Sequence, residues 1–246
     1  MRNLIRLEAT RVSAFGLLLL ILPATSGVQQ LPPIAEEMAK TYGLDSWGQI
    51  EGIRYTFNLD IPNLITLSHS WEWNPKTDTV TFEGKDKDGK AMKVTYARSQ
   101  LASQSDAVKN QVEPAFVNDQ YWLVFPFHVV WDGGKTVTDD GMKKLPVGNG
   151  SAERVVVKYH PSQGGYTPGD TWELYVGPDK RVQAMVYHRG GPKKPSLVIA
   201  TWEGYKKAGP LLFATDHRGT ADGKPLHLTF TGVAVKVTGS DWMNAQ

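Results

Sequence analysis

Hydrophobic and polar residues alternate one by one over much of the chain, which is the period of a β-strand with one buried face. The first four alternating runs are joined by short turns rich in Gly, Pro, Asn and Asp, and they predict four antiparallel strands in meander order at residues 53–59, 67–73, 80–82 and 92–96. Later runs predict strands at residues 128–131, 153–160, 171–176, 181–189, 197–205, 211–217 and 226–237. Short strands in this number indicate one antiparallel sheet that is large enough to curl.

The period changes to that of a helix near the start of these strands. Ile34, Met38 and Tyr42 recur every fourth residue, with acidic side chains in the first turn. This spacing predicts a short amphipathic helix over residues 32–42 that ends at Gly43.

A second helical region interrupts the strands. Residues 99–112 are polar and compatible with a helix, and Ala115–Phe125 predicts another helix that ends before Pro126. The predicted fold class is therefore α+β: a large curved antiparallel β-sheet, or half-barrel, with helices covering the concave face.

Aromatic residues are concentrated in the segment Phe116–Phe127, where four of them fall between Tyr121 and Phe127. Aromatic residues two apart in the first two strands also share one face. If the sheet curls, these faces line a concavity and the aromatic helix closes its open side, although an ordinary filled core would give the same pattern. The residues predicted to line a ligand site are Tyr55, Phe57, His69, Trp71, Trp73, Trp122 and Phe125.

The first residues have the features of a secretory signal. Three Arg precede a short apolar run at residues 14–22, and small residues follow it. The apolar run has roughly half of the ~20 residues that a spanning helix needs. The sequence therefore predicts a signal peptide at residues 1–26, a single curved-sheet domain at residues 27–246, and a periplasmic or secreted protein with no transmembrane segment.

Charge and cysteine content narrow the classes of function. Removing residues 1–26 takes three Arg and one Glu from totals of 27 basic and 25 acidic residues, which leaves 24 of each. A near-neutral mature chain argues against nucleic acid as a partner. The chain has no cysteine, which excludes disulfides, thiolate metal sites, a cysteine nucleophile and a lipid-anchored cysteine.

Familiar catalytic motifs are absent: the chain has no G-x-S-x-G, H-E-x-x-H, Walker loop or G-x-G-x-x-G. No catalytic residue, metal or cofactor is predicted. Strand alternation places Asp216 and Arg218 on one face as an ion pair and His217 on the other. His128 and Asp132 could pair only if a bend brought them together.

The segment Phe116–Phe127, with Trp131 to Gly134 after it, resembles a family of uncharacterised exported bacterial proteins that carry an NDxYWLxxPF motif. Residues 166–176 and 201–205 are similar to later strands of that family. More distantly, the chain resembles the half-barrel of the periplasmic lipoprotein carriers (LolA/LolB-like), in which helices cover an unclosed sheet. The resemblance implies a fold and supplies no catalytic residues.

The leading hypothesis is that an exported protein binds or carries a hydrophobic small molecule, lipid or lipoprotein acyl chain, with His69 orienting a polar head group. One alternative is a hydrolase that uses His69, His188 or His217 beside a carboxylate. Another is a scaffold whose aromatic segment binds a partner protein.

Overall fold

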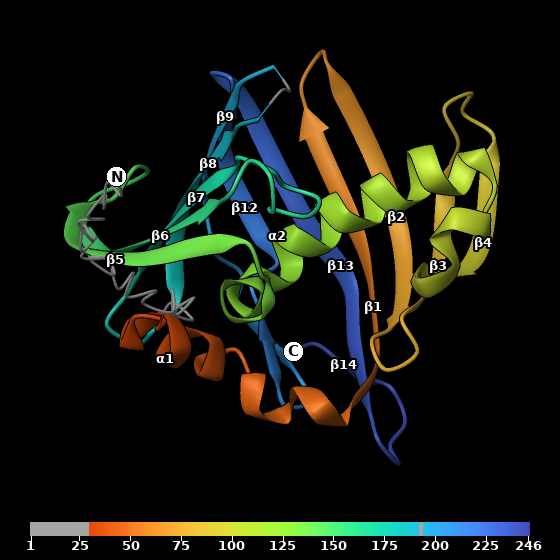
Figure 1. Cartoon of the computed structure of the whole chain (residues 1–246), viewed down its shortest axis with the longest axis horizontal. Helices are drawn as coiled ribbons and strands as arrows, with labels where there is room; N and C mark the ends of the chain where they lie inside the picture. Colours follow the sequence, from red (N-terminus) through yellow and green to blue (C-terminus); the bar gives the residue numbers. More distant parts are fainter. Residues whose placement is uncertain (1–29, 192–193) are drawn as a thin grey trace, which may run out of the picture.

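A computed structural model of the chain describes residues 30–191 and 194–246 (Figure 1). In these residues, twelve antiparallel strands form one open, curved sheet in the order β4-β3-β2-β1-β13-β12-β9-β8-β7-β6-β5, with β14 paired to β13. The strands are β1 (Ile50–Ile61), β2 (Ile65–Asn74), β3 (Thr79–Lys85), β4 (Ala91–Ala97), β5 (Lys135–Lys144), β6 (Ser151–Tyr159), β7 (Thr171–Val176), β8 (Val182–Arg189), β9 (Ser196–Thr201), β12 (Asp216–Ala221), β13 (Lys224–Val237) and β14 (Met243–Asn244). A separate pair is formed by β10 (Lys206–Ala208) and β11 (Leu211–Phe213). The predicted fold class is confirmed.

Helices lie on the concave side of this sheet. The long helix α2 (Glu113–Trp131) runs diagonally across the concave face from β4 towards β5 (Figure 1). It is preceded by a 3₁₀ turn, η2 (Arg98–Ser103), and a π-helical turn, η3 (Val108–Val112). The helix α1 (Pro33–Thr41) and the 3₁₀ turn η1 (Leu44–Gln49) cover the lower end of the sheet (Figure 1). The predicted first helix and the four-strand meander are therefore confirmed, with α2 covering the concave face.

The helix α2 does not end before Pro126, and the predicted strand at residues 128–131 is wrong. Proline lacks the N–H that would bond to the preceding turn, and the helix absorbs this loss with a kink at Val124 (φ −121°, ψ 19°). Residues 119–129 are all buried, so the helix is packed on every side. Apolar burial on this scale outweighs the roughly 3 kcal/mol that an internal proline costs.

One strand was missed by the sequence prediction, and two predicted strands have other bounds in the structure. The edge strand β5 was not predicted because Val137 is its only buried residue, so it lacks an apolar alternation. Of the predicted strand at 197–205, only the part up to Thr201 forms, since the chain turns at Gly204 (φ +64°). The predicted strand at 211–217 divides between β11 and β12.

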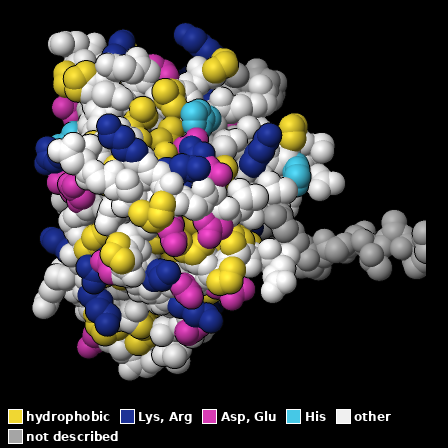
Figure 2. Space-filling model, turned by 90° about the vertical axis from the view of Figure 1, so that its left-hand side faces the viewer, with side chains coloured by type: hydrophobic (Ala, Val, Ile, Leu, Met, Phe, Trp, Pro, Cys, Tyr) yellow, Lys and Arg dark blue, Asp and Glu magenta, His cyan; other side chains and the backbone are white. Residues whose placement is uncertain are grey.

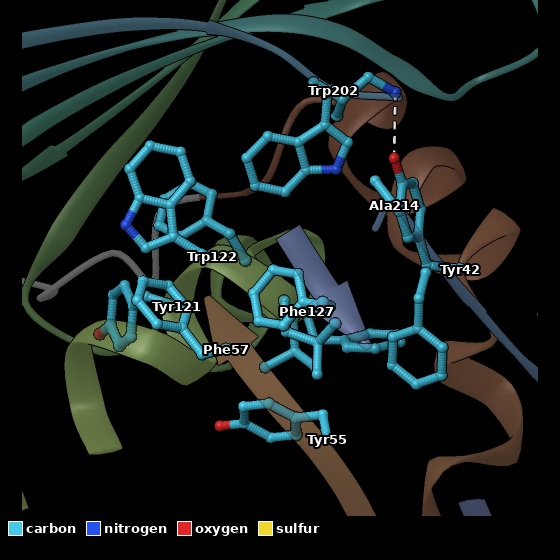
Figure 3. Packing of buried hydrophobic residues seen from close by; sticks show 14 of the residues in the cluster. Tyr42, Tyr55, Phe57, Tyr121, Trp122, Phe127, Trp202 and Ala214 are labelled. Atoms are coloured by element: carbon cyan, nitrogen blue, oxygen red, sulfur yellow. Dashed lines mark hydrogen bonds between the residues drawn. The ribbon is translucent and has the colours of Figure 1, made fainter. Parts of the chain in front are cut away.

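The main core is an aromatic-rich cluster between the sheet and α2, and a second, small cluster is formed by Ala152, Tyr175, Ala184 and Val186. In Figure 3, Tyr55 and Phe57 from β1 lie with Tyr121, Trp122 and Phe127 from α2 in the main cluster, and Trp202 closes it on the far side. On the outside, basic and acidic side chains are interspersed over the face shown in Figure 2. In the described part of the chain, no helix is both long enough and apolar enough to cross a membrane.

His217 is completely buried in this core on β12. Its Nδ1–H donates to the carbonyl oxygen of Thr201 at 3.1 Å, and its ring lies 4.3 Å from that of Trp202. Burial lowers the pKa of His217 to about 4. The folded protein therefore holds a neutral imidazole at pH values where the unfolded chain binds a proton.

We predict that this histidine makes stability depend on pH. Above pH 6.5 neither state is protonated, and as the pH falls from about 6.5 to 4 only the unfolded state gains a proton, so stability falls by about 3 kcal/mol. Urea unfolding between pH 7 and pH 4 should show this loss in the wild type and not in His217→Gln. The exposed His160→Gln variant should follow the wild type, and parallel curves for wild type and His217→Gln would refute the prediction.

Candidate functional site

The predicted site residues lie between the sheet and α2 or on α2 itself, and they form two groups; all are buried except His69, which is partly exposed. Tyr55, Phe57, His69, Trp71 and Trp73 occupy one face of β1 and β2, where Tyr55 pairs with Trp71 and Phe57 with His69. Trp122 and Phe125 lie against β7, with ring centroids 5.9 and 4.1 Å from that of Trp172. The two groups are linked through Phe230, which contacts Tyr55 and Phe57, and His217, which contacts both Phe230 and Trp122. That the seven predicted residues bind a ligand stays a prediction.

A buried carboxylate joins α2 to the aromatic face of β2. Asp119 Oδ2 lies 2.7 Å from His69 Nδ1 and accepts a hydrogen bond from Trp71 Nε1 at 2.9 Å, while the Asn118 amide donates to Oδ1 at 3.0 Å. The carboxylate is buried, and about 18% of the His69 side chain is exposed. The sequence prediction missed Asp119, although Asn118-Asp119 is a polar pair inside the most hydrophobic helix, and that was the available signal.

His69 and Asp119 have the geometry of a base and the group that orients it. A carboxylate at Nδ1 fixes the tautomer and leaves Nε2 as the reactive nitrogen, and such an imidazole can accept a proton from water or a hydroxyl group. In the described part of the chain, no hydroxyl group is hydrogen-bonded to His69. The hydrolase alternative therefore stays a prediction and would need water as the nucleophile.

The other two candidate histidines are placed differently. His188 Nε2 lies 3.3 Å from Glu173, on a largely exposed part of β8. His217 faces the aromatic core and donates to a backbone carbonyl. Asp216 pairs with Arg218 at 3.1 Å on the opposite face from His217, as the alternation predicts.

The start of α2 is held by a second buried carboxylate. Glu113 accepts hydrogen bonds from the hydroxyls of Tyr96 (2.6 Å) and Tyr166 (2.9 Å) and from Arg98 Nε (3.0 Å). Arg98 also pairs with Asp78 at 3.2 Å. Burial alone would lower the pKa of Arg98, but the two carboxylates raise it above its ordinary value. Glu113 thus ties the helix to β4 and to the loop that carries Tyr166.

An aromatic pocket of about 290 Å³ lies beside α2. We define it by its lining residues, which are contributed by η1, the end of β2 and the turn after it, η2, α2 with its C-cap, and the loop after β6: Trp47, Trp73, Pro75, Arg98, Val117, Gln120, Tyr121, His128, Trp131, Asp132 and Tyr166. The rings of Trp47 and Trp131 lie 4.4 Å apart, and those of Trp47 and Trp73 lie 5.7 Å apart. Of the seven predicted site residues, Trp73 lines this pocket.

The polar end of the aromatic pocket is a hydrogen-bonded network around Asp132. Oδ2 accepts from the hydroxyls of Tyr121 (2.6 Å) and Tyr159 (2.7 Å), and Oδ1 lies 2.8 Å from His128 Nδ1. Burial of Asp132 opposes ionisation, but these hydrogen bonds outweigh it and hold the pKa of Asp132 below its usual value. His128 reaches Asp132 because the helix continues past Pro126 and places them one turn apart, which the strand prediction could not show.

A larger edge hollow of about 1260 Å³ lies between β2 and the β3–β4 hairpin. Among the predicted site residues it is lined by His69, while Phe57, Trp122 and Phe125 lie in the packed interior. Leu59, Leu67 and Met92 add apolar surface where the hollow meets the core.

Four buried polar atoms in the aromatic core lack a hydrogen-bond partner in the described part of the chain. They are Tyr55 Oη, Trp172 Nε1, Trp202 Nε1 and His217 Nε2. An unsatisfied buried polar group costs about 1–3 kcal/mol.

No family model matches the chain, and no curated protein matches it. Solved structures are similar to it in backbone arrangement. A LolA superfamily protein from Nitrosomonas europaea has a TM-score of 0.46 and 7% identity, covering 84% of this chain and 94% of its own. A DUF1329 family protein from Desulfovibrio piger has a TM-score of 0.43 and 10% identity, covering 85% of this chain and 94% of its own. Scores and identities this low carry no inference about function.

Proposed function

We propose that this protein is an exported, single-domain binding protein that holds a hydrophobic molecule, such as a lipid or an acyl chain, between α2 and the concave face of its sheet. The observation that carries the proposal is the aromatic pocket, in which Trp47, Trp73 and Trp131 form apolar walls beside a few fixed polar groups. Binding sites for small hydrophobic ligands typically combine these two features. The predicted leader at residues 1–26, which supplies export, lies outside the described residues.

The aromatic pocket leads towards the other predicted residues. The ring centroid of Phe116 lies 5.6 Å from that of Trp73 and 5.4 Å from that of Trp71. A chain-like ligand that displaced the Trp73 side chain would therefore reach the aromatic face of β1 and β2. Arg98 and His128 line the pocket wall, where their nitrogens are held by Glu113 and Asp78 and by Asp132 and Gln120. A polar head group would have to compete with these contacts, and the orienting role of His69 remains a separate proposal at the edge hollow.

We expect palmitate to change the tryptophan fluorescence of the protein on titration, and native mass spectrometry to show a bound lipid in protein taken from its own compartment. Trp131→Ala should weaken palmitate binding by about tenfold, or roughly 1.4 kcal/mol, because it removes one wall of the pocket. The matched control is Trp242→Ala, since Trp242 lies under the Arg54 guanidinium and does not line the pocket.

Thermal unfolding of both variants should confirm that they are folded. The proposal fails if wild-type protein shows neither a spectral change nor a co-purifying lipid. It also fails if the two variants bind palmitate as tightly as the wild type.

A further inference from the structure

The edge hollow opens in the gap between β2 and the β3–β4 hairpin and extends to nearby residues of β1, β13 and η3. Side chains of a strand alternate between faces, so a groove on one face is lined by every second residue. This hollow is lined by six consecutive residues of β2, 65–70, and by five consecutive residues of β3 and its turn, 83–87. The backbone edges of these two strands therefore form part of its wall.

The two edges belong to strands that stop pairing with each other. The β2–β3 ladder ends at Ser70 and Glu83, whereas β2 continues beside β1 as far as Ile65. β3 continues beside β4 to the pair Lys85–Ala91. In Figure 1 the β1–β2 and β3–β4 hairpins accordingly lie apart at their tips.

One hydrogen bond at the end of β3 fixes which of its backbone groups face the hollow. The N–H of Asp86 donates to the carbonyl of Lys90 at 2.9 Å, so Asp86 is directed towards β4. Backbone groups of successive residues in an antiparallel strand point to opposite sides. Lys85 is therefore directed away from β4 into the hollow, and Glu83, two residues earlier, is directed to its partner Ser70.

The same alternation applies along β2. The backbone groups of Ser70 point to β3, so those of Ser68 and Thr66 point to the same side of β2. At Ser68 and Thr66, however, β2 is no longer paired with β3. The hollow thus has backbone donors and acceptors of Thr66 and Ser68 on one side and of Lys85 on the other. Exposed strand edges of this kind pair with an added strand.

We propose that the edge hollow binds an extended peptide segment, which adds to the free edge of β2 while the β3–β4 hairpin closes its other side. The side chains around the hollow select an alternating peptide: Leu67 and Met92 pack with the core on the concave face, and Ser68 and Lys93 are exposed on the convex face. Apolar and polar residues of the peptide would meet these two faces in turn. The site shares no lining residue with the aromatic pocket, so it does not depend on the lipid proposal.

The probe is a fluorescein-labelled nine-residue peptide in which valine and threonine alternate between terminal lysines, followed by fluorescence anisotropy on the full mature chain. Two twins carry N-methyl groups on all valines or on all threonines. Added-strand pairing needs one alternate set of peptide N–H groups, so at least one twin should bind at least tenfold more weakly. Hydrogen exchange at residues 66, 68 and 85 should slow when the unmodified peptide binds.

Variants separate backbone pairing from side-chain contact. Ser68→Pro removes a donor that faces the hollow and should weaken peptide binding at least tenfold, whereas Ser68→Ala keeps the donor and should bind normally. Thr95→Pro is the matched control, because the exposed Thr95 lies on the outer edge of β4. No peptide binding, binding of both twins as tightly as the unmodified peptide, or an unaffected Ser68→Pro would overturn the proposal. Self-association of the chain that Ser68→Pro abolishes would also overturn it, by making a second copy the occupant.

Discussion

Replacing Glu113 with alanine is expected to lower the free energy of unfolding by about 3–5 kcal/mol, because it leaves a half-buried guanidinium and two tyrosine hydroxyls without their common acceptor. Glu113 is 1% exposed, and Arg98, Tyr96 and Tyr166 all donate to it. Of its two ion pairs, Arg98 would keep the one with Asp78. Urea unfolding followed by circular dichroism measures the change.

The matched control for this variant is Glu83→Ala. Glu83 pairs with Lys93 at 2.9 Å, but both side chains are more than half exposed. Surface pairs contribute little, so this variant should stay within about 0.5 kcal/mol of the wild type. Equal losses for the two variants would show that Glu113 does not anchor α2 to the sheet.

Replacing Trp122 with alanine is expected to cost about 3–5 kcal/mol through the cavity it leaves in the core. Trp122 is 7% exposed, and its ring lies 5.7 Å from His217, 5.9 Å from Trp172 and 6.2 Å from Trp202. Figure 3 shows it on α2 facing Trp202. Because the ring is buried within one chain, size-exclusion chromatography should give the same elution volume for wild type and variant.

Trp242→Ala provides the comparison for Trp122→Ala. Trp242 is half-buried under Arg54, at 4.7 Å from the guanidinium carbon, and its loss should cost about 1 kcal/mol. If Trp122→Ala changed the assembly and left stability intact, the aromatic segment would be a partner-binding surface. The scaffold hypothesis would then replace that of a buried covering helix.

The contrast between β2 and α2 illustrates what local pattern can predict. Alternation placed His69, Trp71 and Trp73 on one face, and the structure agrees because a half-buried sheet fixes the period of two. The end of α2 was misplaced because Pro126 is a strong local signal for termination. Packing on all sides of that helix, which no local window contains, overrides it.

The candidate sites show the same limit. The aromatic segment around Trp122 was found from its composition, yet the carboxylates that position it, Asp119 and Glu113, were not. Each gains its role from partners distant in sequence: Asp119 from His69, 50 residues away, and Glu113 from Tyr166, 53 residues away. Such pairings form only when the sheet curves and the helix crosses it.

By itself, the sequence determined the fold class, the four-strand meander and the face on which the aromatic residues lie, because side-chain period and turn chemistry are local properties. Only the tertiary structure decided that α2 continues through Pro126 and that His69 meets Asp119. It also decided that β2 and β3 separate beyond Ser70 to leave an open strand edge. These features depend on how the strands diverge and which surfaces the helix buries, and both are set by packing between segments far apart in the chain.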